Sequence, residues 1–344
     1  MRVWKDFILA LPKAELHVHL EGSVTPEVAM RLAARRGVRL PFDERGPEGL
    51  RAAYRFTGFR DFLELYIAVS RCLQRSEDVV EIAVDLARRL AEQNVRWAEV
   101  TFTPMTHVAR GVAFDTLMAG LHEGRARAEA EHGVCVRWVF DVVRSFPDQA
   151  APTIDFALGM QRRDPGSVVG VGVGGPEGDR YPMDVIATQV RRAKAEGLRS
   201  VPHAGENAGA SSIWTAVREL AADRIGHGVR CLEDPALVDH LRAHAIPLEV
   251  CPGSNVALKV VPSLREHPLP QLLEAGLAVT LGSDDPPMFG TDLVSEYGTC
   301  AAAFGWDAAM LRGLADASFV HAFAPPDRVA GWRAEVAAVE MPRM

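Results

Sequence analysis

The sequence predicts an α/β protein folded as a TIM (β/α)8 barrel, with extra helices inserted after the first strand. Short apolar runs with the character of buried strands alternate with longer segments of helical periodicity, which is typical of a parallel sheet. Eight such strands indicate the closed form of that sheet. The predicted strands cover residues 15–20, 95–102, 135–143, 168–173, 199–203, 224–227, 248–251 and 278–282.

The segments between these strands carry the helical pattern. Apolar residues recur at helical spacing in 79–93 and 116–131, for example. The stretch 22–94 is long for one connection, so we expect it to add helices beside the barrel mouth, where they would suit a lid. Within it, residues 41–49 are expected to form a loop. The tail after Phe323 is predicted to form a helix packed outside the barrel.

Composition narrows the class of protein. The chain has 344 residues, a net charge of −7 and no dense Lys/Arg cluster, which argues against a nucleic-acid partner. No apolar stretch approaches the roughly 20 residues of a membrane span, and the first residues are charged where a signal peptide is apolar. A cytoplasmic protein without a membrane partner is therefore expected. Five cysteines without a CxxC pair predict reduced thiols, and the absence of linkers or repeats predicts a single domain over 1–344.

The first predicted strand ends in His17, Val18 and His19. Side chains alternate along a strand, so both imidazoles face the same side, at the end where barrel active sites lie. Two neutral imidazoles on a rigid strand suit a borderline cation such as zinc. The pair alone is equally compatible with two ordinary polar residues on one strand face.

Further polar residues follow later strand ends. His203 ends the fifth strand, His227 ends the sixth, and Asp284 and Asp285 follow the eighth. Because the C-terminal ends of barrel strands share one mouth, we expect these residues to converge with the first histidine pair. The alternative for the two aspartates is a turn that caps the next helix. The other histidines lie mostly in helical or loop contexts and receive no role: His107, His122, His132, His240, His244, His267 and His321.

The chemistry of these residue types suggests their roles. Three imidazoles and one carboxylate would leave a bound dication positively charged, able to lower the pKa of a water molecule. Glu206 lies three residues after His203 and is suited to shuttle a proton. Asp285 is suited to orient or deprotonate the attacking water, and His227 to stabilise its charge. The predicted ligands of one Zn²⁺ per chain are His17, His19, His203 and Asp284.

Residues 170–175 match the pattern G-x-G-x-x-G after a strand, as in dinucleotide-binding sites. Such a site needs a helix that opens at the glycine-rich loop. Here the chain continues into a loop that contains Pro176 and Pro182. We therefore reject a dinucleotide site and expect these glycines to let a flat ring approach the backbone closely.

Taken together, these motifs resemble those of the adenosine deaminase family, in order and over nearly the whole chain. The resemblance implies a TIM barrel that usually holds one zinc, with the same four ligands. It also implies that Glu206 protonates the purine ring nitrogen beside the reacting carbon, that His227 is catalytic, and that Asp285 is the second aspartate of its pair. The matching segments are 11–22, 203–206, 225–228, 249–255 and 283–286.

On the substrate side the resemblance is less uniform. It implies that the backbone of Gly175 contacts the purine and that His19 and Asp285 also face the substrate. Glu21 stands where adenosine deaminases usually have an aspartate that binds the ribose 5′-hydroxyl; related adenine deaminases have glutamate there. The glycine-rich loop 172–177 is similar to actinobacterial members, some of which deaminate aminodeoxyfutalosine.

The prediction from sequence is hydrolytic deamination of a 6-aminopurine nucleoside, namely adenosine or deoxyadenosine, at a cyclic amidine C–N bond. The alternatives are the same reaction on aminodeoxyfutalosine, a menaquinone precursor, or on free adenine. A more distant alternative is a metal-dependent esterase or amidase of the broader amidohydrolase superfamily. Many of those hold two metals bridged by a carboxylated lysine, but no lysine falls at the end of the predicted fourth strand, which favours one metal. The non-enzymatic alternative is a zinc-binding barrel. The H-x-E and C-x-x-C signature of deaminases that act on flipped bases is absent.

Overall fold

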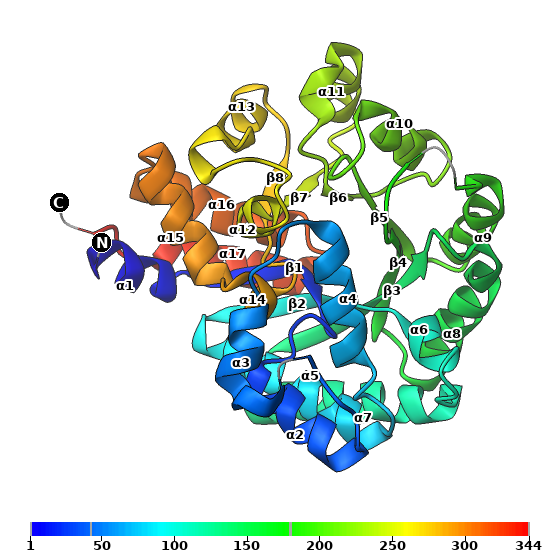
Figure 1. Cartoon of the computed structure of the whole chain (residues 1–344). Coiled ribbons are helices and arrows are strands. Elements are labelled where there is room, and N and C mark those ends of the chain that lie inside the picture. Colours follow the sequence, from blue (N-terminus) through cyan, green and yellow to red (C-terminus); the bar gives the residue numbers. More distant parts are fainter. Residues whose placement is uncertain (1, 42, 179–180, 343–344) are drawn as a thin grey trace.

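The computed structural model describes residues 2–41, 43–178 and 181–342, and its centre is a nearly closed barrel of eight parallel strands (Figure 1). Each strand pairs with the next one in chain order. The predicted (β/α)8 barrel is therefore confirmed. The strands are β1 (Lys13–His19), β2 (Val95–Phe102), β3 (Cys135–Val143), β4 (Val168–Gly174), β5 (Arg199–Ala204), β6 (Ile225–His227), β7 (Leu248–Val250) and β8 (Val279–Leu281).

The barrel closes where β1 meets the residues that follow β8. Val18 and Asp284 form a parallel bridge. The His19 N–H donates to the Asp284 carbonyl at 2.9 Å, and the Asp284 N–H donates to the His17 carbonyl at 2.8 Å. The seam of the barrel is thus built from residues that the sequence marks as functional.

Helices cover the outside of the barrel and bury the outer faces of the strands, while the inner faces pack inside the barrel, so most strand residues are buried. The helices expected at 79–93 and 116–131 are present as α5 (Ser76–Glu92) and α7 (Phe114–His132). The helices are α1 (Arg2–Ala10), α2 (Pro26–Arg36), α3 (Gly46–Ala53), α4 (Phe59–Ser70), α5 (Ser76–Glu92), α6 (Pro104–Val108), α7 (Phe114–His132), α8 (Ala150–Arg163), α9 (Met183–Ala195), α10 (Ala210–Arg218), α11 (Pro235–Ala243), α12 (Pro252–Ala257), α13 (Leu269–Glu274), α14 (Pro286–Phe289), α15 (Leu293–Phe304), α16 (Ala308–Val320) and α17 (Pro326–Ala338).

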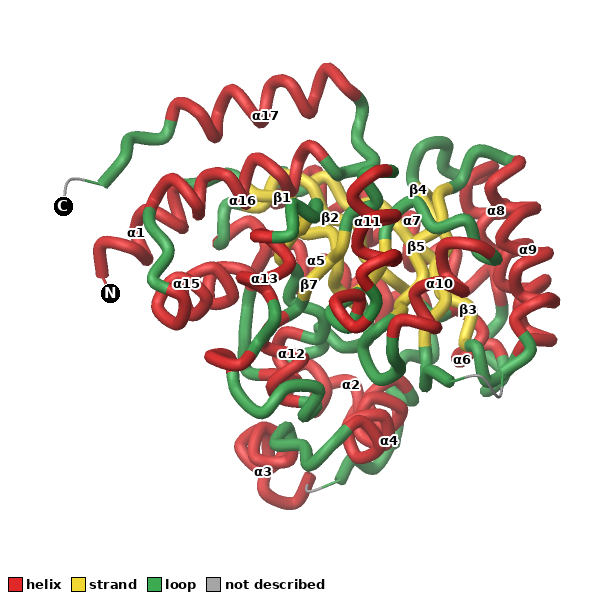
Figure 2. Tube along the Cα trace, turned by 90° about the horizontal axis from the view of Figure 1, so that it is seen from above, coloured by secondary structure: helices red, strands yellow, loops and turns green. Residues whose placement is uncertain are grey.

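The insertion after β1 forms α2, α3 and α4, as expected. Figure 2 shows α3 and α4 at one end of the barrel, opposite the end where α17 lies. The prediction of a loop at 41–49 is wrong for residues 43–49, because a 3-10 helix spans Asp43–Arg45 and α3 begins at Gly46. Residue 42 lies outside the described residues. Pro47 lies in the first turn of α3, where its missing N–H costs no hydrogen bond.

The tail after Phe323 forms α17, which packs outside the barrel as predicted. Trp332 of α17 is 6% exposed. Its ring stacks on Phe319 with centroids 5.3 Å apart and lies 5.9 Å from the ring of Trp97 in β2. Trp332 and the buried Val336 therefore anchor the helix to the barrel.

Two expectations about the class of protein can be compared with the structure. Within the described ranges, we find no helix whose length and apolar character would let it cross a bilayer. All five cysteines are free and buried, in agreement with reduced thiols.

The anchoring role of Trp332 can be tested by substitution. We expect Trp332→Ala to lower the free energy of unfolding by about 3–5 kcal/mol, the usual cost of removing a buried aromatic ring. Urea unfolding followed by circular dichroism measures this change. The matched control is Gly331→Ala in the same helix, where a new Cβ would meet no atom and stability should change by no more than about 1 kcal/mol. Equal unfolding midpoints for the two variants would contradict the anchoring role.

Candidate active site and metal centre

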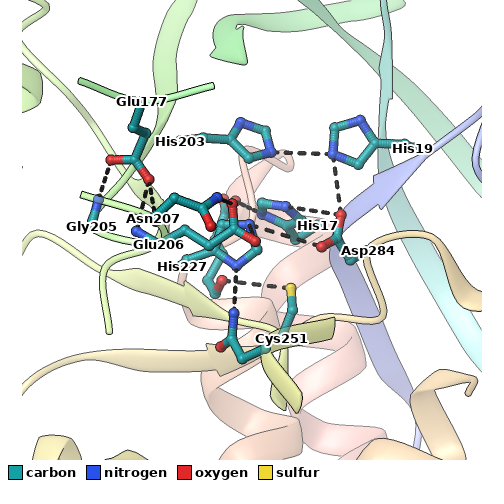
Figure 3. Close-up of polar contacts among 12 residues, drawn as sticks. His17, His19, Glu177, His203, Gly205, Glu206, Asn207, His227, Cys251 and Asp284 are labelled. Atoms are coloured by element: carbon teal, nitrogen blue, oxygen red, sulfur yellow. Dashed lines mark hydrogen bonds and ion pairs between the residues drawn. The ribbon is translucent and has the colours of Figure 1, made fainter. Parts of the chain in front are cut away.

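The residues predicted as ligands meet at the C-terminal ends of the strands. Figure 3 shows the side chains of His17 and His19 from β1, His203 from β5, and Asp284 facing one another, with His227 from β6 beside them. Candidate ligand atoms from this set lie within 4.8 Å of one another in overlapping groups of three. The expected convergence of these strand ends is present.

The distances among the four predicted ligands are short. His19 Nε2 lies 3.1 Å from His203 Nε2 and 3.3 Å from Asp284 Oδ1. His17 Nε2 lies 3.7 Å from the same Asp284 oxygen. Two ring nitrogens and a carboxylate oxygen at this spacing can share one small cation.

His17 provides a direct test of whether the cluster fits a metal. Its Nδ1 lies 2.8 Å from Glu249 Oε2, so the ring donates there and directs the lone pair of Nε2 toward the other ligands. That Nε2 is buried and has no hydrogen-bond partner. An unpartnered imidazole nitrogen among two further imidazoles and a carboxylate is the donor set of zinc-type ions. The residues therefore fit a bound divalent metal.

Glu249 is held by a second layer of buried charge. Arg224 donates to Glu249 from one side of its guanidinium and to Glu99 from the other, both at 2.5 Å. All three side chains are at most 1% exposed. Pairing one guanidinium with two carboxylates limits the free-energy cost of burying these charges. The orientation of His17 thus depends on residues from three different strand regions.

Glu206 lies in the loop after β5 and is 7% exposed. The Glu177 carboxylate fixes this loop by accepting the N–H groups of residues 205, 206 and 207 at 2.8–2.9 Å. Burial, followed by the negative charge of Asp284, raises the pKa of Glu206 well above its ordinary value. A carboxyl group that keeps its proton near neutral pH can act as a general acid.

Asp285 follows Asp284 and also faces the site. Its Oδ1 is buried without a hydrogen-bond partner. Burial and the neighbouring Asp284 charge raise its pKa well above the ordinary range, which makes its carboxylate a stronger base. Gly22 makes room for it, since a Cβ at that position would lie 1.4 Å from Asp285 Oδ1.

His227 ends β6 with φ of +62°, a left-handed conformation that is uncommon for a histidine. Its Nε2 lies 3.9 Å from both Glu206 Oε1 and Asp284 Oδ2. Strained backbone that is held by its surroundings is common at functional sites. The imidazole therefore faces the same space as the candidate acid and the candidate ligands.

A cavity of about 330 Å³ opens over these residues. Its floor is polar and its outer wall, supplied largely by α4, is apolar. The floor residues are His19, His203, Glu206, His227, Asp284 and Asp285, and the outer wall contains Phe59, Phe62, Leu63, Ile67, Phe146 and Leu258.

The predicted substrate-side residues divide into two groups. His19, Gly175 and Asp285 line the cavity. Glu21 is fully buried and is not among the lining residues. Its Oε1 accepts the Thr103 N–H at 2.9 Å and lies 3.1 Å from His107 Nε2. The protein itself therefore occupies one oxygen of this carboxylate.

The glycine-rich strand β4 has a different partner from the one expected. A Cβ at Gly172 or Gly174 would clash with the Asp141 carboxylate at 1.9 or 2.5 Å, so these glycines accommodate a protein side chain. Only Gly174 and Gly175 reach the cavity. After β4 the first helix among the described residues is α9, which begins at Met183, in agreement with the rejection of a dinucleotide site.

Several residues near the site had no role assigned from the sequence, Asp141, Tyr66 and His267 among them. Asp141 lies 3.9 Å from His203 Nδ1, Tyr66 of α4 lines the cavity, and buried His267 hydrogen-bonds Asn255 behind His227. Asp141 had a usable signal, because it is a carboxylate inside the apolar run 135–143. Tyr66 and His267 lie outside the strand ends, so only the folded chain brings them there.

Comparison with known proteins identifies the family. A model of the adenosine deaminase family matches residues 12–339. An aminodeoxyfutalosine deaminase of Streptomyces avermitilis is 44% identical over 323 residues, which cover 92% of this chain and 89% of that protein. An adenine deaminase of Rhodospirillum rubrum is 42% identical over 340 residues, which cover 98% of this chain and 100% of that protein. This chain belongs to the adenosine deaminase family.

Membership fixes the reaction class. The protein is a hydrolytic deaminase that acts on the amidine C–N bond of a purine, and deaminases of this kind depend on a metal. The structure of an amidohydrolase from Burkholderia ambifaria with bound zinc matches this chain with a TM-score of 0.89 and 28% identity. That match covers 98% of this chain and 92% of the other.

The space that Gly22 leaves for Asp285 yields a test of the site geometry. We expect Gly22→Ala to displace the Asp285 carboxylate and to lower kcat by about 100-fold, the cost of a displacement near 1 Å in an active site. Ammonia release measures kcat, and circular dichroism checks the fold. The control is Gly313→Ala in α16, where a new Cβ would meet no atom. Unchanged turnover in Gly22→Ala would show that the position of Asp285 is unimportant.

Proposed function

We propose that this protein is a zinc-dependent deaminase of a 6-aminopurine that carries a large 5′ substituent, of the aminodeoxyfutalosine kind. The observation that carries the proposal is the cavity, in which a polar catalytic floor continues into an apolar, partly aromatic outer wall. The 44% identity to an aminodeoxyfutalosine deaminase over 92% of the chain supports the same substrate class.

One zinc ion per chain is the metal we propose, with His17, His19, His203 and Asp284 as its ligands. The unpartnered His17 Nε2 and the short distances among these donors support this set. Bound there, the cation would supply Lewis acidity that lowers the pKa of a water molecule toward neutrality.

The chain's own residues would complete the reaction. Glu206 donates its proton to the ring nitrogen beside the amino-bearing carbon, which makes that carbon more electrophilic. Asp285 orients the attacking water and accepts its proton. Addition of the water oxygen forms the C–O bond at that carbon. The amino group then takes the proton held by Asp285 and leaves as ammonia when the C–N bond breaks, and the hydroxyl proton returns to the Glu206 carboxylate as the ring carbonyl forms. The buried floor excludes bulk water and strengthens each of these interactions.

The outer wall of the cavity supports a substrate with an apolar 5′ extension. The cavity volume of about 330 Å³ lies at the lower end of the range of about 300–1,000 Å³ that is usual for ligand pockets. Phe146 at the mouth is 51% exposed and offers an aromatic surface for an apolar extension. An apolar ring on the 5′ side would cover this surface on binding.

Free adenine is the second candidate. It is supported by the 42% identity to an adenine deaminase that covers the whole of that protein. Adenosine, the first expectation from sequence, has less support, since neither relative acts on it by name. Moreover, Glu21 does not line the cavity, and the protein itself occupies its Oε1, although the buried Oε2 has no hydrogen-bond partner.

We also propose that residues 1–344 form one domain. The bridge between β1 and the segment after β8 supports this proposal, because both parts of the chain complete the same barrel. The expected cytoplasmic location stays a prediction.

A comparison of substrates tests the proposed function. Ammonia release should be measured with aminodeoxyfutalosine, adenine, adenosine and deoxyadenosine, and expressed as kcat/KM. We expect aminodeoxyfutalosine to exceed the others by tenfold or more, which corresponds to about 1.4 kcal/mol of transition-state binding. A preference for adenine would overturn the 5′-substituent proposal in favour of the second candidate.

The role of Glu206 can be tested separately. Glu206→Gln keeps the shape of the side chain but removes the proton that the acid donates. We expect kcat to fall by about 100- to 10,000-fold while the metal content, measured by elemental analysis, stays equal to that of the unchanged protein. Normal turnover in this variant would rule out Glu206 as the general acid.

A further inference from the structure

A buried line of polar side chains runs from His227 away from the cavity. Asn255 Nδ2 lies 3.4 Å from His227 Nδ1, and Asn255 Oδ1 lies 3.0 Å from His267 Nε2. The line ends at the backbone of Leu269, whose N–H donates to His267 Nδ1 at 3.0 Å. All three side chains are at most 1% exposed, so their hydrogen bonds are set by one another.

Leu269 determines the direction of each bond in this line. A backbone N–H can only donate, so His267 Nδ1 must be the bare, accepting nitrogen. Burial lowers the pKa of His267 to about 4, and its neutral ring therefore carries one proton, on Nε2. That proton needs an acceptor, which is the amide oxygen of Asn255. The amide NH₂ group of Asn255 is consequently directed toward His227.

The contacts on both sides of the His227 ring indicate the same tautomer. An NH₂ group facing Nδ1 requires a lone pair there, which leaves the proton of a neutral imidazole on Nε2. On the opposite side, Nε2 faces oxygen atoms of Glu206 and Asp284, both at 3.9 Å. The other tautomer would place N–H against N–H at the Asn255 amide, and the buried groups could not be satisfied.

We propose that Asn255 and His267 are positioning residues that hold His227 with its proton on Nε2, so that His227 donates a hydrogen bond to the attacking water. In this arrangement His227 stabilises negative charge on the water oxygen and cannot take its proton, which passes to Asp285. The inference rests on the proposed hydrolytic deamination. It assigns a direction to a hydrogen bond that the proposed function leaves open.

Asn255→Asp tests this inference most sharply. The carboxylate is nearly isosteric with the amide but accepts where the amide donates, so it requires a proton on His227 Nδ1. The matched control is Asn94→Asp at the other end of the barrel, where the amide donates to the Ala10 carbonyl and is exposed. Both variants are purified with their metal and compared with the unchanged protein.

The decisive measurement is ¹⁵N NMR of histidine-labelled protein, with the His227 signals assigned by their loss in His227→Gln. In the unchanged protein and in Asn94→Asp, we expect a pyridine-type Nδ1 and a pyrrole-type Nε2. In Asn255→Asp, Nδ1 becomes pyrrole-type, kcat falls by about 100-fold, and KM and metal content change little. A protonated Nδ1 in the unchanged protein, or full kcat in Asn255→Asp, would overturn the inference.

A second pair of variants covers the case in which Asn255→Asp fails to fold. His267→Gln keeps a side-chain N–H for the Asn255 oxygen, whereas His267→Phe fills similar space without any donor. We expect His227 to keep its tautomer, and more of kcat, in His267→Gln than in His267→Phe. Equal behaviour of the two would contradict a role for the line. Because the NMR signals do not depend on turnover, failure of the proposed reaction and failure of this inference are distinguishable.

Discussion

Backbone hydrogen bonds between β1 and Asp284 close the barrel and bring candidate metal ligands together in the same step. Each partner contributes one N–H: His19 donates to Asp284, and Asp284 donates to His17. The bond pattern holds Asp284 at a φ of +62°, a conformation that costs on the order of 1–3 kcal/mol for a residue other than glycine. If the seam opened, the carboxylate would leave both imidazoles, so the site can exist only in the closed barrel.

The chemistry of the site follows from burying many charged groups at one end of that barrel. Burial raises the pKa values of both Glu206 and Asp285, and in our proposal Glu206 acts as the acid and Asp285 as the base. Glu249 stays paired with Arg224, which keeps a carboxylate behind His17. Burial would destabilise a charge that had no partner. Here the paired charges orient the candidate ligands, and burial raises the pKa values of the two carboxyl groups that we propose for proton transfer.

Much of this site could be predicted from the sequence. The apolar pattern and the length of each segment predict the strands, and the polar residues that follow predict where the strands end. β2 and β3 have the predicted bounds, and the four predicted ligands meet. Other features depend on contacts between distant segments, which spacing does not encode. Glu21 lies two residues after His19, yet it does not line the cavity and contacts Thr103 and His107 instead. His267 joins the neighbourhood only through the loop that precedes α13.

The central claim is that one metal ion occupies the point where the ends of β1, β5 and β8 meet. Anomalous diffraction from crystals of the purified protein, recorded on both sides of the zinc absorption edge, tests this claim directly. The account predicts a single zinc peak per chain, within bonding distance of His17, His19, His203 and Asp284. Two metal peaks per chain, or a single peak held by other residues, would contradict it.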